Sequence, residues 1–195
     1  MTPMKQFEVI DNFLSLYEWD KIKKFMASDH FPWYKTPAKI PQNPIQDKEY
    51  HAFNHNIILD GSYYFESKVN YADILMKQLK RIKGNVRLQV IRAKANMFIQ
   101  TEENLGLGLH YDITNSDNYE TLLYFINDNN GGVEFEDKTF IRQKENRAVI
   151  IYGMIKHQSI TQTDTMERYN VNINYRELVW VKKLIAWSEI QLCRY

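Results

Sequence analysis

Residues 86–99 read VRLQVIRAKANMFI, and the character of their side chains alternates with a period of two. Such alternation is typical of a β-strand whose two faces meet different surroundings. One face carries only apolar side chains, namely Ile91, Ala93, Ala95, Met97 and Ile99. We expect this face to pack against a second layer, such as helices.

The opposite face of this predicted strand starts apolar and becomes polar toward its end. Its side chains are Val86, Leu88, Val90, Arg92, Lys94, Asn96 and Phe98. Basic and amide side chains at these positions fit a polar cavity that holds an anion, and they equally fit a face that meets solvent. The sequence leaves both interpretations open.

More short strands follow, with turn signals between them. Residues 121–126 and 148–152 are apolar runs of strand length. Residues 127–132, NDNNGG, predict a hairpin turn, because Asn and Gly tolerate positive φ. In residues 168–175, Tyr169, Val171, Ile173 and Tyr175 alternate with Arg168, Asn170, Asn172 and Asn174. This succession predicts a mainly β sandwich or barrel.

The first 85 residues are expected to support the β core. A short strand is predicted at residues 7–10, and Ser15 with Glu18 has the spacing of a capping box at the start of a helix that runs to about residue 28. A second amphipathic helix is predicted at about residues 74–82, ended by Gly84.

Residues 30–56 contain four prolines and predict a long irregular segment. Such a segment is either a lid over a site or a connector whose aromatic side chains pack on the core. His51 and His55 lie in it, four residues apart. With no carboxylate motif beside them, we expect ordinary hydrogen-bonded histidines rather than metal ligands.

Composition narrows the class of protein. The chain has 195 residues, of which 44% are hydrophobic and 14% aromatic, enough for one domain with a substantial core. Lys plus Arg number 25 against 24 for Asp plus Glu, so no basic excess points to nucleic acid. The single cysteine, Cys193, fits a reducing compartment. With no secretory signal and no run long enough to cross a bilayer, a cytoplasmic location without membrane contact is expected.

The pair His110 and Asp112 is a candidate metal-binding motif. On a strand, residues i and i+2 point to the same side, about 6.5–7 Å apart along the chain. A third ligand would come from a neighbouring strand, and His157 is the best placed. Two imidazoles and one carboxylate form the facial set that holds non-haem Fe(II) and leaves coordination positions open.

The order of these motifs, His110-Tyr111-Asp112, Gly131-Gly132, His157 and Arg168, resembles the Fe(II)/2-oxoglutarate-dependent dioxygenases of the prolyl 4-hydroxylase-like branch. Residues 122–127, LLYFIN, with 131–135, GGVEF, are similar to a strand–hairpin–strand of that branch, and residues 9–15, VIDNFLS, resemble its N-terminal lead-in. The likeness spans most of the chain, and its specific part lies between His110 and Arg168. Small members in tailed bacteriophages are similar, so the expected cytoplasm could be that of a host cell.

The resemblance implies a double-stranded β-helix, the cupin-like jelly roll, with N-terminal helices that support one sheet. The whole chain, 1–195, would be a single dioxygenase domain. Residues 1–85 would form helical and irregular support, residues 86–178 the jelly-roll core, and residues 179–195 a C-terminal extension.

The resemblance also implies the ligands. His110, Asp112 and His157 would bind Fe(II), O2 would take an open position, and ascorbate could assist as a reductant. Arg168 would bind the 5-carboxylate of 2-oxoglutarate, because its planar fork suits a carboxylate. Such a bond contributes about 1.5–3 kcal/mol. Phe98 stands where the branch has a tyrosine that contacts the co-substrate, so that contact must come from Arg92, Asn96 or Tyr124, or be absent.

The implied activity is hydroxylation of a C–H bond, with succinate and CO2 as co-products. The primary substrate is unidentified, either a peptide or protein side chain or a small molecule. A non-catalytic jelly-roll binding module and a nucleic-acid dealkylase are the alternatives. Asn174 stands where the dealkylating branch needs a second arginine, so nucleic acid is not the expected partner. An acidic Asp112 argues against a halogenase.

Overall fold

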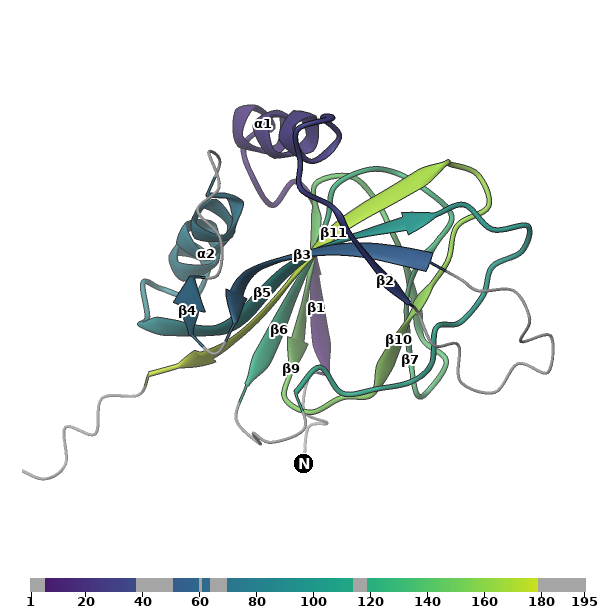
Figure 1. Cartoon of the computed structure of the whole chain (residues 1–195). Coiled ribbons are helices and arrows are strands. Elements are labelled where there is room, and N and C mark those ends of the chain that lie inside the picture. The colour runs from purple at the N-terminus through teal and green to yellow at the C-terminus, as the bar shows by residue number, and fades with distance from the viewer. Residues whose placement is uncertain (1–5, 38–50, 60, 64–69, 114–118, 179–195) are drawn as a thin grey trace, which may run out of the picture.

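The computed structural model describes residues 6–37, 51–59, 61–63, 70–113 and 119–178, and this part of the chain forms two antiparallel sheets and two helices (Figure 1). The strands are β1 (Phe7–Ile10), β2 (Tyr34–Pro37), β3 (His51–Leu59), β4 (Ser62–Tyr63), β5 (Leu88–Ile99), β6 (Glu120–Phe125), β7 (Gly132–Phe135), β8 (Phe140–Arg142), β9 (Arg147–Tyr152), β10 (His157–Ile160) and β11 (Glu167–Glu177). The large sheet has the order β1-β9-β6-β11-β5-β3-β2, with β4 beside β3, and the small sheet has the order β10-β7-β8.

The two faces of the large sheet meet different layers. One face packs against α1 (Leu16–Met26) and α2 (Tyr71–Ile82), which lie on the same side of the sheet in Figure 1. The core on this side includes Leu75 and Leu79 of α2 with Ala93 and Ala95 of β5. The other face meets the small sheet through a second apolar cluster: Leu123, Phe125, Val133, Phe135, Val149 and Ile151. The predicted packing of helices on the apolar face of β5 is therefore confirmed.

Local signals place the helices as predicted. The hydroxyl of Ser15 accepts a hydrogen bond from the Glu18 backbone N–H, and the Glu18 side chain accepts one from the Ser15 N–H, which completes the capping box of α1. Trp19 then donates its indole N–H to the Ile126 carbonyl at 2.9 Å and ties α1 to the sheet. α2 ends just before Gly84, whose φ of +77° is the left-handed conformation that glycine adopts without strain.

The segment at residues 30–56 is more regular than its prolines suggest. Its ends form β2 and β3, and β3 pairs with β5 in the large sheet. His55 is buried, and its Nδ1 lies 3.0 Å from the Pro32 carbonyl oxygen, which agrees with a hydrogen-bonded histidine. Residues 38–50, the middle of the segment 30–56 that is predicted as a lid or a connector, and the predicted extension at 179–195 are outside the described residues. No helix in the described ranges is long and apolar enough to cross a bilayer.

The predicted hairpin at residues 127–132 is wrong. β6 belongs to the large sheet and β7 to the small one, so this segment crosses between sheets. Gly131 and Gly132 are needed for space, not for positive φ. A Cβ on Gly131 would lie 2.7 Å from the Ile160 carbonyl oxygen, and one on Gly132 would lie 2.2 Å from the Ile141 carbonyl oxygen.

Gly132→Ala is expected to lower the free energy of unfolding by about 3 kcal/mol, since overpacking against fixed backbone lies at the upper end of such costs. The oxygen it would strike belongs to the β7–β8 ladder and cannot swing away. Gly84→Asn is the control, because nothing lies within 4 Å of a Cβ added at residue 84 and Asn also adopts the left-handed conformation. Urea denaturation measures both variants, and equal stabilities would contradict the crowding at Gly132.

Candidate metal centre

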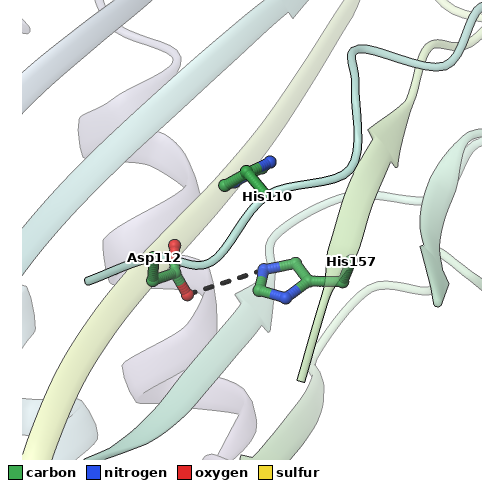
Figure 2. A group of neighbouring side chains, drawn as sticks. All are labelled: His110, Asp112 and His157. Carbon is green, nitrogen blue, oxygen red and sulfur yellow. Dashed lines mark ion pairs between the residues drawn. The ribbon is translucent and has the colours of Figure 1, made fainter. Parts of the chain in front are cut away.

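His110, Asp112 and His157 come together at one end of the space between the two sheets. His110 and Asp112 lie in the segment between β5 and β6, and His157 is the first residue of β10 (Figure 2). The His110 backbone N–H donates to the His157 carbonyl oxygen at 3.0 Å, and the His157 backbone N–H donates to the His110 carbonyl oxygen at 3.2 Å. The predicted motif is thus held by an isolated β-bridge, not by a regular strand. One ligand atom from each of the three residues lies within 4.8 Å of the others.

Backbone carbonyls orient both imidazoles. His110 Nδ1 lies 2.9 Å from the Gly108 carbonyl oxygen, and His157 Nδ1 lies 2.9 Å from the Ile155 carbonyl oxygen. A carbonyl oxygen only accepts, so Nδ1 must carry the proton in each ring. In the neutral form of either ring Nε2 keeps its lone pair, which is the arrangement that second-shell contacts give to metal-ligating histidines.

The Asp112 carboxylate is held by side chains from three strands. Its side chain is 3% exposed. Oδ1 accepts from Arg92 Nη2 and from Asn172 Nδ2, both at 3.0 Å, and Oδ2 accepts from Thr121 Oγ1 at 2.9 Å. Burial acts to raise the pKa of Asp112, but the charge of a protonated His157, the charge of Arg92 and the hydrogen bond from Thr121 outweigh it and lower the pKa. The carboxylate is therefore ionised and fixed in direction.

These three residues fit a divalent metal ion. At metal–ligand bonds of about 2.1 Å, three atoms on one face of an octahedron lie about 3 Å apart. His157 Nε2 and Asp112 Oδ2 are 3.5 Å apart, and all three ligand atoms lie within 4.8 Å of one another, so the side chains would have to close in on the ion to complete the set. His110 is exposed, which leaves an open side for further ligands. In the part of the chain that the structure describes, this is the one group of His, Cys, Asp and Glu side chains that could hold a metal.

Arg168 lies deep in the same space. It is 0% exposed, its Nη1 donates to the Gly132 carbonyl at 3.0 Å, and its guanidinium carbon lies 4.2 Å from the centre of the Phe98 ring. It shares a face of β11 with Asn172, about 13 Å away along the strand. The structure thus places the predicted anchor on the face that carries the partners of Asp112.

The other predicted co-substrate contacts divide between the two faces of the large sheet. Arg92 and Asn96 face the metal centre: Arg92 Nε donates to Asn174 Oδ1 at 2.9 Å, and Asn96 Nδ2 donates to Asn170 Oδ1 at 2.8 Å. Arg92 is occupied by Asp112 and supports the metal ligand.

Tyr124 does not face the metal centre. It packs in the helix-side core, and its hydroxyl donates to Asn146 Oδ1 at 2.9 Å. The predicted contact between Tyr124 and the co-substrate is therefore wrong. Thr121 and Asn172, which hold Asp112 in place, were not predicted from the sequence. The polar alternation in residues 168–175 is the signal that could have identified Asn172.

Tyr124→Phe is expected to leave 2-oxoglutarate affinity unchanged and to lower the free energy of unfolding by about 1 kcal/mol, the typical worth of one hydrogen bond. Calorimetric titration and urea denaturation measure the two quantities. A loss of co-substrate affinity in this variant would contradict the placement of Tyr124 on the helix side of the sheet.

Three comparable solved structures share this architecture. A 2OG-Fe(II) oxygenase family oxidoreductase from Burkholderia pseudomallei is 11% identical, with 88% of this chain and 85% of that chain covered and a TM-score of 0.63. A prolyl hydroxylase from Trichoplax adhaerens, in complex with a hypoxia inducible factor peptide fragment, is 14% identical. The match covers 89% of this chain and 84% of that chain, with a TM-score of 0.60. HygX from Streptomyces hygroscopicus, with nickel, 2-oxoglutarate and hygromycin B bound, is 9% identical. The match covers 88% of this chain and 83% of that chain, with a TM-score of 0.55.

No protein-family model and no curated protein matches the sequence. At these identities the likeness concerns the fold. The chain has the jelly-roll fold of the 2-oxoglutarate/Fe(II) oxygenases, prolyl hydroxylases included, as the sequence predicts. Within that fold it carries a His-Asp-His group of the kind that binds iron.

Proposed function

We propose that the protein is an Fe(II)- and 2-oxoglutarate-dependent dioxygenase that hydroxylates a C–H bond of its primary substrate. The observation that carries this proposal is the donor set itself. Two imidazoles with protonated Nδ1 atoms and one ionised carboxylate converge within 4.8 Å, with an exposed side left open. A jelly roll that served only as a scaffold would have no need to hold Asp112 in this way.

The protein's own residues would hold and orient the reactants. His110, Asp112 and His157 would bind Fe(II), and Arg92, Asn172 and Thr121 would keep the Asp112 carboxylate in place. Arg168 would bind the far carboxylate of 2-oxoglutarate, because its charge is fixed at the buried end of the site. Bound Fe(II) with 2-oxoglutarate and O2 supplies the oxidising chemistry, with succinate and CO2 as co-products.

The proposed primary substrate is either a peptide or a small molecule. The Trichoplax adhaerens enzyme is in complex with a peptide, and HygX holds the small molecule hygromycin B. Both kinds of partner thus occur on this fold. A cytoplasmic location remains part of the proposal, supported by the single cysteine.

The direct test is production of succinate from 2-oxoglutarate in the presence of Fe(II), ascorbate and O2. We expect slow, substrate-independent succinate formation by the wild-type protein and none by the His110→Ala variant. Omission of Fe(II) is the second control. A protein that binds Fe(II) and 2-oxoglutarate but never forms succinate would be a binding module, which would contradict the proposed activity.

A further inference from the structure

Lys94 lies beside the metal centre, and no described residue pairs with its side chain. It projects from the same face of β5 as Arg92 and Asn96. Its Cα partners are Asn172 on β11 and Asn56 on β3. Among the described residues, no hydrogen bond or ion pair joins the Lys94 ammonium group. Burial and the charge of Arg92 lower the pKa of Lys94, and the charge of Asp112 acts to raise it. Lys94 is partly buried, so a ligand can still reach it.

Asn172 leaves a buried acceptor at the same place. Its Nδ2 donates to Asp112 Oδ1 at 3.0 Å, and an ionised carboxylate only accepts, so the orientation of the amide is fixed. Oδ1 then points away from Asp112. Within the described part of the chain this oxygen has no hydrogen-bond partner, and the residue is only 9% exposed. A buried acceptor without a partner is costly, which makes it a candidate ligand contact.

The two side chains together indicate which chemical groups a ligand would need. The Lys94 ammonium group would bind an anion, and Asn172 Oδ1 would accept a hydrogen bond from an N–H or O–H donor. Directly opposed residues on neighbouring antiparallel strands have Cα atoms about 4.5–5.5 Å apart, so one small group could meet both. 2-Oxoglutarate has carboxylates but no donor, and would leave Asn172 Oδ1 unsatisfied. A carboxylate with an amine on the next carbon provides both.

We propose that Lys94 and Asn172 bind the primary substrate through an α-carboxylate and its neighbouring N–H, so that the substrate is an α-amino acid. The inference rests on the proposed function, because it places this group beside the metal that the same function requires. Among the described residues of this face of β5, Arg92 is already engaged by Asp112, which leaves Lys94 as the cation available to the substrate.

The test uses the protein loaded with Mn(II) and 2-oxoglutarate, because paramagnetic Mn(II) broadens the proton resonances of any ligand that lies close to it. The probes are an equimolar mixture of the common L-amino acids, the same mixture as primary amides, and the same mixture as N-acetyl derivatives, which mimic a peptide C-terminus. Wild-type protein is compared with Lys94→Met and Lys94→Arg. Lys77→Met, an exposed lysine of α2, is the matched control.

We expect at least one free amino acid to be broadened by the wild-type and Lys77→Met proteins, and its amide to bind about tenfold to a hundredfold more weakly. Lys94→Met should show the same loss, and Lys94→Arg should retain part of the binding. Stronger broadening of the N-acetyl forms would identify a peptide C-terminus and overturn the free amino acid as substrate.

Calorimetry on the same samples separates this inference from the proposed function. Unchanged Mn(II) and 2-oxoglutarate affinities in Lys94→Met, with loss of the amino acid, would support it. Loss of 2-oxoglutarate affinity would assign Lys94 to the co-substrate and overturn the inference alone. Equal broadening by Lys94→Met, or no broadening of any probe, would also overturn the amino-acid inference and leave the proposed function untouched. Wild-type protein that binds neither Mn(II) nor 2-oxoglutarate would contradict the proposed function itself.

Discussion

Asp112→Ala is expected to lower the affinity for Fe(II) or Mn(II) by at least about a hundredfold, because loss of a second-shell contact alone typically costs tenfold to a hundredfold. The variant removes one of three ligands and the negative charge that offsets the metal. Succinate formation should fall below detection with it. Anaerobic calorimetric titration with Mn(II) measures the affinity.

Asp112→Ala also leaves Arg92 without its carboxylate, so a loss of stability could be mistaken for a loss of metal binding. His110→Ala provides the cleaner comparison, since His110 is exposed and its side chain makes its one hydrogen bond among the described residues with a backbone carbonyl, beside a ring contact with His157. We expect it to lose the metal while it keeps the wild-type urea midpoint. Asp20→Ala, on the outer surface of α1, is the matched acidic control. Metal affinities within twofold of wild type in both site variants would rule out the proposed ligands.

Arg168→Ala is expected to weaken 2-oxoglutarate binding by about 1.5–3 kcal/mol, or tenfold to more than a hundredfold, which is the worth of a charge-assisted hydrogen bond. The guanidinium is fully buried, so water cannot replace it cheaply. The effect should be confined to ligands with a second carboxylate. Pyruvate, which lacks that group, should bind the variant and the wild type alike.

Arg168→Lys is the matched variant, because it keeps the charge but loses the planar fork. We expect it to recover part of the affinity for 2-oxoglutarate. Competition between pyruvate and 2-oxoglutarate on the Mn(II)-loaded protein gives the ratio of affinities directly. A ratio that stays at the wild-type value in Arg168→Ala would show that the far carboxylate is bound elsewhere.

Local patterns in the sequence predict those parts of the fold that depend on neighbouring residues. The capping box of Ser15 and Glu18 and the alternation in β5 are examples, since each is decided within a few positions of the chain. The polar series in β11, from Arg168 to Asn174, likewise falls on one face as its period requires. The order of His110, Asp112 and His157 was sufficient to predict their convergence.

Other features depend on contacts between distant segments. Tyr124 lies in a strand that is buried on both faces, so its neighbours show no alternation that would tell one face from the other. The segment before β7 looks like a hairpin because its composition suits any tight turn, and only the pairing of β7 with β8 and β10 shows that it crosses between sheets. The partners of Asp112 come from three strands, which no local pattern reveals.

The most direct measurement is an anomalous difference map from crystals grown anaerobically with Mn(II) and 2-oxoglutarate. We predict one strong peak about 2.1 Å from His110 Nε2, His157 Nε2 and an Asp112 oxygen, with the far carboxylate of 2-oxoglutarate on Arg168. A metal peak away from these three side chains, or none at all at saturating Mn(II), would contradict the assignment of this site as a metal centre.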